Sequence, residues 1–123
     1  MNMDINTLYL PYTATKPSVV ILNSMSYVYG VNGMSNGTIR MYITLDNKIV
    51  YDSGNQKKGF QQAATYTPNA KINIPVGSTL NCYAIFTGEY CYRIDPENGN
   101  QNTSVTNKKL SANSYNGSLM TAD

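Results

Sequence analysis

One stretch near the middle of the chain decides the fold: Thr38-Ile-Arg-Met-Tyr-Ile-Thr-Leu45. Apolar side chains alternate along it with polar or amphipathic ones, and the apolar set is Ile39, Met41, Ile43 and Leu45. A period of two is typical of a β-strand with one face in a hydrophobic core and the other in solvent. We therefore predict a half-buried strand over residues 38–45.

A turn and a second strand follow directly. Asp46-Asn47 is a pair of turn-forming residues, and Lys48-Ile-Val-Tyr-Asp52 after it ends at Ser53-Gly54. Two strands joined by two turn residues predict a β-hairpin, and a four-residue loop would give the same register. We expect an antiparallel pair here.

The hairpin supplies the candidate binding residues, Tyr42 and Tyr51. Its register sets them opposite each other, on the face away from Ile43 and Val50. Tyrosine offers a large amphipathic contact area and is favoured at interfaces. If that face is exposed, the two tyrosines form a contact patch. If Ile43 faces solvent instead, they are core residues with satisfied hydroxyls.

Period-two alternation extends over most of the chain, and no stretch has the sustained 3.6 period of a helix. The further strands expected cover residues 5–12, 18–22, 26–31, 59–67, 71–74, 78–86 and 89–94, the last two joined by a turn at Thr87-Gly88. About seven strands or more with Gly, Pro and Asn turns predict an all-β immunoglobulin-like sandwich of two antiparallel sheets, with a jelly roll as the alternative. Its core should hold Ile39, Met41, Ile43, Val50, Leu80, Cys82 and Phe86.

The chain divides by composition into two parts. Residues 1–97 are expected to form the sandwich domain. Residues 98–123 are more polar, and we expect an extended arm or edge strands of the same domain there.

The residues that most catalysis requires are missing. The chain has no histidine, which removes the commonest general base and metal ligand. Neither a Gly-x-Ser-x-Gly elbow nor a phosphate loop is present. The loop at residues 95–100 lacks the acid spacing of a calcium loop, so a turn is expected there. We predict no enzyme activity, no catalytic residues, no metal and no cofactor.

Low charge is the unusual feature of the composition. Only 13% of the residues are charged, about half the usual share, and the net charge is +2. There is no basic stripe for nucleic acid, no apolar run of membrane-helix length, and no signal-peptide pattern at the start. A neutral polar surface desolvates cheaply, which suits contact with protein or sugar. AT-rich codon usage would also produce such a composition.

A resemblance to a known group of proteins rests on the strand–turn phrase Lys71-Ile-Asn-Ile-Pro-Val-Gly-Ser-Thr-Leu-Asn-Cys-Tyr-Ala-Ile-Phe86, the excess of Asn and Tyr, and the length. Together these resemble small virion proteins of tailed bacteriophages, in particular the auxiliary (decoration) capsid proteins of crAss-like phages. The likeness covers the whole chain in character, and no diagnostic motif carries it, so no functional residue is transferred.

The resemblance implies a virion protein, made in the host bacterial cytoplasm, that binds the outside of a capsid and stabilises it or contacts the host surface. The implied partner is the major capsid protein or another phage structural protein, with homo-oligomer or lattice contacts. A carbohydrate-binding or adhesin-type module with a glycan ligand is the alternative, because it too would be all-β, rich in Tyr and Asn, and without catalytic residues.

We predict that both cysteines, Cys82 and Cys91, are unpaired thiols. They lie nine positions apart and match no metal or redox spacing. Synthesis in a reducing compartment disfavours a disulfide. Titration in denaturant without reductant should find two thiols per chain, and fewer than two would contradict the prediction.

Overall fold

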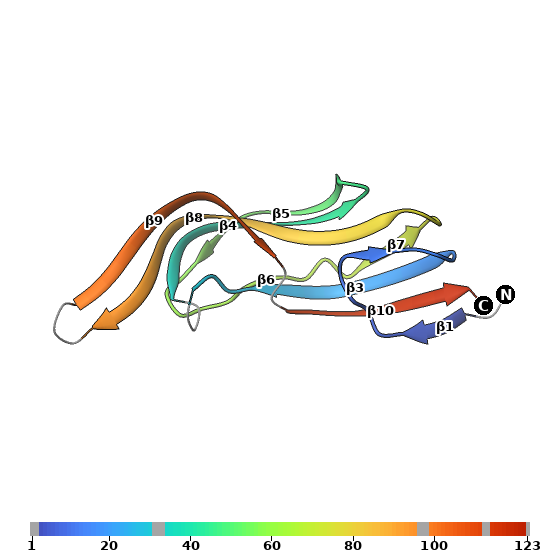
Figure 1. Cartoon of the computed structure of the whole chain (residues 1–123), viewed down its shortest axis with the longest axis horizontal. Helices are drawn as coiled ribbons and strands as arrows, with labels where there is room; N and C mark the ends of the chain where they lie inside the picture. Colours follow the sequence, from blue (N-terminus) through green and yellow to red (C-terminus); the bar gives the residue numbers. More distant parts are fainter. Residues whose placement is uncertain (1–2, 31–33, 96–98, 112–113, 123) are drawn as a thin grey trace.

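The computed structural model describes residues 3–30, 34–95, 99–111 and 114–122, which form two antiparallel sheets packed face to face (Figure 1). The described residues contain no helix. The strands are β1 (Met3–Asn6), β2 (Tyr12–Thr13), β3 (Ser18–Tyr27), β4 (Ser35–Leu45), β5 (Lys48–Lys58), β6 (Ala64–Tyr66), β7 (Ala70–Ile74), β8 (Thr79–Asp95), β9 (Gly99–Ser111) and β10 (Ser114–Ala122).

The order of the strands is that of an immunoglobulin-like sandwich. One sheet runs β1-β10-β3-β6, with β7 also beside β3, and the other runs β2-β8-β4-β5, with β9 also beside β8. The series β5-β4-β8-β9 corresponds to strands C′, C, F and G of an immunoglobulin domain, and β3 beside β7 corresponds to B beside E. The predicted β-sandwich is confirmed. The last strand, β10, takes the place beside β3 that a first strand has in that fold.

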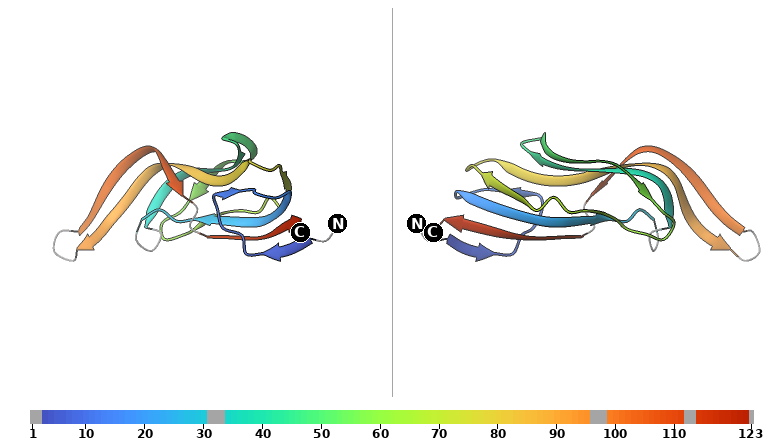
Figure 2. Two further views of the ribbon diagram at one scale, coloured as in Figure 1. Left: turned by 45° about the vertical axis from the view of Figure 1, so that its right-hand side comes forward. Right: turned by 180° about the vertical axis from the view of Figure 1, so that it is seen from behind.

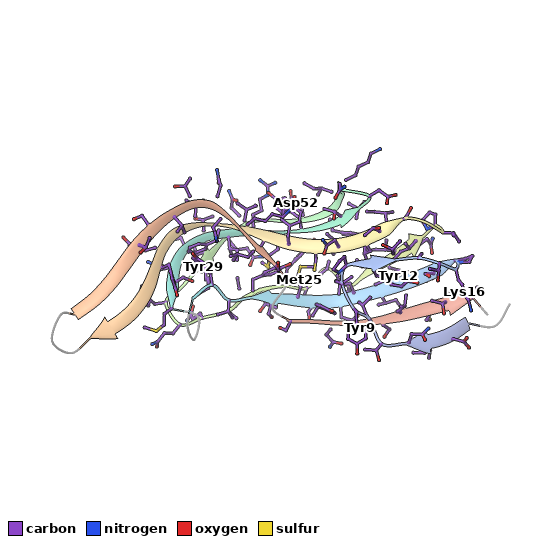
Figure 3. All side chains as sticks on the ribbon, viewed as in Figure 1. Tyr9, Tyr12, Lys16, Met25, Tyr29 and Asp52 are labelled. Atoms are coloured by element: carbon purple, nitrogen blue, oxygen red, sulfur yellow. The ribbon has the colours of Figure 1, made fainter. Side chains whose placement is uncertain are left out.

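The core lies between the two sheets. From β8 it takes Leu80, Cys82, Ala84 and Phe86, each exposed by 3% or less, and β4 and β3 contribute Ile39, Met41, Ile43, Val20, Leu22, Met25 and Tyr27. Figure 3 shows Met25 between the sheets. All of the predicted core residues are buried except Val50, which is 43% exposed.

The register of the β4–β5 hairpin explains this exception. Its two-residue turn forms as predicted, with Asp46 and Asn47 at φ values of 52° and 65° and Leu45 paired with Lys48. These left-handed values match a type I′ turn, which suits the twist of the strands.

Beyond the turn the predicted pairing is wrong. The register shifts after Thr44, so that Ile43 lies opposite Tyr51 and Tyr42 lies opposite Asp52. An extra residue in one strand of an antiparallel pair is a β-bulge, and a slip by one residue exchanges the faces of all later side chains. The bulge therefore puts Tyr51 on the inner face and leaves Val50 in solvent.

The turn expected at Thr87-Gly88 is absent, because β8 continues through it to Asp95. Gly88 pairs directly with Gly37 of β4. A Cβ atom on Gly88 would lie 2.2 Å from the carbonyl oxygen of Asn36, and one on Gly37 would lie 2.2 Å from that of Thr87. Here glycine permits a close approach of two strands. Residues 18–22 were predicted as a strand separate from 26–31, but β3 runs through both 18–22 and 26–27. Residues 28–30 are not in a strand, and position 31 lies outside the described residues.

The described part of residues 98–123 forms two strands of the sandwich rather than an extended arm. β9 pairs with β8, and β10 lies between β1 and β3. Leu110 and Leu119 from these strands are buried in the core. Both strands are therefore integral to the two sheets.

A two-stranded ribbon projects from the sandwich at the end opposite the chain termini (Figures 1 and 2). The described pairing of β4 with β8 ends at Ser35 and Tyr90. Beyond it β9 is the one described strand that pairs with β8, as far as Asp95 opposite Gly99. We call β8 residues 91–95 with β9 residues 99–102 the distal ribbon. At its base the ring of Tyr29 packs against Phe86 and Tyr90, at centroid distances of 5.3 and 4.8 Å.

The close approach at Gly88 gives a stability prediction. Gly88→Ala should lower the free energy of unfolding by about 1–3 kcal/mol, because the new methyl group must push two backbones apart. Urea unfolding measures this. Thr38→Val, an exposed change next to Gly37, is the control and should stay within about 0.5 kcal/mol of the parent. Equal stability of all three proteins would contradict the β4–β8 register.

Candidate functional site

A row of five side chains crosses the outer face of the second sheet. Asp52 comes from β5, Arg40 and Tyr42 from β4, Tyr83 from β8 and Lys109 from β9. Alternation on each strand points these residues away from the core, because their neighbours Met41, Ile43, Cys82 and Leu110 point inward. We call this set the cross-strand row. Figure 3 labels Asp52 on this outer side.

The centre of the cross-strand row is a pair of tyrosines on adjacent strands. Tyr42 and Tyr83 lie directly opposite each other, with ring centroids 5.1 Å apart and planes tilted by 34°. Aromatic pairs at this separation stabilise a sheet beyond the area that they bury. Both rings are half-buried, and neither hydroxyl has a hydrogen-bond partner among the described residues. The pair thus presents two hydroxyl groups to solvent above two packed aromatic rings.

A cation lies over each ring. The guanidinium carbon of Arg40 is 5.6 Å from the centre of the Tyr42 ring, and Nζ of Lys109 is 4.5 Å from that of Tyr83. Both distances are in the range of cation–π contacts. Positive charge therefore flanks the aromatic pair on both sides.

Asp52 neutralises one of these cations. Nε of Arg40 donates to Oδ1 of Asp52 at 2.8 Å, and a terminal guanidinium nitrogen donates to Oδ2. This bidentate pair lowers the pKa of Asp52, chiefly through the hydrogen bond from Arg40, and raises the pKa of Arg40. The lowered pKa of Asp52 contributes stability at pH values above the ordinary pKa of the carboxyl. This contribution is lost as the pH falls through the lowered pKa. Since the pair is exposed, the effect is small.

The structure separates the two tyrosines that the sequence placed together. Tyr42 is on the outer face as predicted, in the cross-strand row. Tyr51 is half-buried against the edge of the core, where it contributes to the raised pKa of Tyr66 behind the larger effects of burial and Asp52. The residue that pairs with Tyr42 is Tyr83. Alternation in the sequence could assign Tyr83 to an outer face, but it could not show that Tyr83 lies beside Tyr42.

Three buried side chains with polar or titratable groups lie away from this surface: Tyr27, Cys82 and Lys58. Tyr27 and Cys82 face each other across the core, and burial raises the pKa of both side chains, so both are neutral. Lys58 is 1% exposed, and its Nζ donates to the carbonyl oxygens of Ser35 and Gly59 at 3.1 and 3.3 Å. The Lys58 ammonium is thus hydrogen-bonded, whereas the buried Tyr27 hydroxyl has no hydrogen-bond partner among the described residues.

A Cys82–Cys91 disulfide within one chain is excluded by the continuity of β8. Nine residues of strand at about 3.3 Å each separate their Cα atoms by about 30 Å. A disulfide needs about 4–7 Å. Cys82 is a free, buried thiol. The side chain of Cys91 lies outside the described residues, as do positions 96–98 of the predicted turn.

The geometry of the cross-strand row predicts an energetic coupling. In a double-mutant cycle, Tyr42→Ala and Tyr83→Ala should couple by about 0.5–1 kcal/mol, because each removal costs the other its ring contact. The matched cycle of Tyr42→Ala with Tyr51→Ala should give a coupling near zero, since those residues lie on opposite faces. Urea unfolding measures both. A larger coupling in the second cycle would restore the register predicted from the sequence.

The described part of the chain offers neither a metal-binding cluster nor a membrane-spanning helix. Its residues contain no group of three or more His, Cys, Asp or Glu side chains placed to hold a metal ion. None of its elements is a helix with the length and hydrophobicity to span a membrane. Comparison with family models, curated proteins and solved structures finds no match for the chain.

Proposed function

We propose that this protein is a structural virion component, an auxiliary or decoration protein that binds the outside of a phage capsid. There it stabilises the shell or contacts the host surface. The observation that carries the proposal is the distal ribbon, a projection built from the same strands that hold the sandwich together. The proposed partner is the major capsid protein or another phage structural protein.

The distal ribbon has the properties of a docking element. Among the described residues its two strands pair with each other and with no third strand, so its edges offer backbone donors and acceptors to a partner. A two-stranded ribbon is marginally stable alone in water, and a third strand or a covering surface stabilises it. Strand addition from a partner would supply both hydrogen bonds and cover.

The base of the ribbon fixes its direction. Tyr29 packs between Phe86 and Tyr90, and Gly30 lies so close that a Cβ atom there would come within 2.5 Å of the Tyr90 ring. This packing makes the exit of the ribbon part of the core. A docking element that is oriented before it binds loses less conformational entropy on binding.

The surface of the sandwich fits a role in a repeating assembly. Few charges need to be desolvated, and the cross-strand row adds amphipathic aromatic area for a second contact. Many copies on one shell would also make weak contacts effective through avidity. Nothing in this role requires catalysis, a metal or a cofactor.

A lysate of the cells that naturally make the protein provides the test. The protein should sediment with intact particles. The ribbon variant replaces residues 92–101 by Asn-Gly, which closes a two-residue hairpin between Cys91 and Asn102, a pair that already lies in register. It should keep the fold by circular dichroism and lose most of its sedimentation with particles.

The control is Ile49→Ser with Val50→Ser, which alters exposed apolar residues of the β4–β5 hairpin and leaves the ribbon intact. It should sediment as the parent does. Finding the parent only in the soluble fraction would overturn the proposal. If the protein were found in the soluble fraction bound to a defined glycan, the function of a carbohydrate-binding or adhesin-type module would replace the proposed capsid binding.

A further inference from the structure

A cavity of about 630 Å³ opens on the edge of the second sheet. It exists because β8 changes partners there. β2 pairs with β8 only through Thr79 and Leu80, and β9 pairs with it from Tyr83 onward. Asn81 and Cys82, which line the cavity, lie between these two contacts. The cavity occupies this gap and has the size of small-molecule binding sites.

Side chains from distant parts of the chain enclose the gap. Leu10, Pro11 and Leu110 give it an apolar wall. Asn81, Ser111 and Tyr115 bring amide and hydroxyl groups, and Lys109 and Tyr83 connect it to the cross-strand row. No acidic side chain is among the described residues that line it.

Several side chains that line the cavity have hydrogen-bond donors without a described protein partner. Oδ1 of Asn81 accepts from the Cys82 backbone N–H at 2.9 Å, which leaves the amide NH₂ without a partner among the described residues. The Tyr115 hydroxyl accepts from the Leu10 N–H at 3.0 Å, which leaves its own proton to donate. The Ser111 hydroxyl has no protein partner in the described part of the chain.

Lys109 adds a positive charge to these donors. Its ammonium lies over the Tyr83 ring, and the described residues contain one ion pair, Arg40 with Asp52, so no carboxylate neutralises Lys109. Charge-assisted hydrogen bonds to carboxylates are stronger than neutral ones. The complementary ligand is rich in acceptors and carries a negative charge.

We propose that this cavity binds a pyranose that bears a carboxylate, such as a hexuronate unit of a glycan. The carboxylate would meet the ammonium of Lys109, the ring hydroxyls would meet Asn81, Ser111 and Tyr115, and the apolar face of the ring would lie on Leu10 and Pro11. This site goes beyond capsid binding and does not depend on it.

Three probes separate the parts of the ligand, and each is titrated into the ¹⁵N-labelled full chain and followed by NMR. Glucuronate carries both ring and carboxylate, glucose only the ring, and acetate only the carboxylate. Glucuronate should shift the amide signals of Asn81, Cys82, Leu110 and Ser111 saturably and bind at least about tenfold more tightly than either other probe, because two sets of contacts combine. Glucose or acetate binding as tightly as glucuronate would overturn the assignment to a sugar with a carboxylate.

Variants test the assignment to Lys109. Lys109→Gln should weaken glucuronate binding by about fivefold or more through loss of the charge-assisted bond, while Lys109→Arg should keep most of it. The matched control is Lys108→Gln, an exposed neighbour outside the cavity lining, which should bind as the parent does. Absence of saturable shifts with glucuronate, or equal losses in the Lys108 and Lys109 variants, would overturn the proposal. Because this experiment uses the purified chain, its outcome is independent of whether the protein sediments with particles.

Discussion

The pairing of β4 with β8 is the interaction on which the rest of the structure depends. It runs from Leu45 opposite Leu80 to Ser35 opposite Tyr90 without a shift of register. Its inner side chains make the larger part of one wall of the core, and its outer ones form the Tyr42–Tyr83 pair. Since β8 then continues beyond β4, the same strand carries the ribbon out of the sandwich. The core, the aromatic pair and the distal ribbon therefore all depend on the same strand, β8.

Much of this was predictable from local pattern, because alternation reports which side chains share a face. Ile39, Met41 and Ile43 were identified as core, and the Asp46-Asn47 turn was correctly placed. The bulge that separates Tyr42 from Tyr51 was not predictable, since alternation along each strand does not show where one strand of a pair carries an extra residue. The turn predicted at Thr87-Gly88 is wrong for a related reason. Glycine is common in turns, but at position 88 it is required because the backbone of the opposite strand at Gly37 lies too close for a side chain.

The candidate sites show the same limit. Tyr42 could be assigned to an outer face, but its partner Tyr83 and the cation of Lys109 come from strands that only the tertiary fold brings alongside. The cavity depends on still more of the tertiary fold, because three segments distant in sequence must meet where β8 changes partner from β2 to β9. Low charge indicated a binding surface in general terms. The location of that surface depends on the pairing of strands that are distant in the sequence, such as β4 with β8.

Amide hydrogen exchange along β8 tests most directly whether one strand serves both core and docking element. In the free protein, amides of residues 80–86 that bond to neighbouring strands should exchange only on global unfolding, and those of residues 91–95 should exchange much faster by local opening of the ribbon. On particles, residues 91–95 should become protected while residues 80–86 stay unchanged. Full protection of residues 91–95 in the free protein, or their continued rapid exchange on particles, would contradict the account.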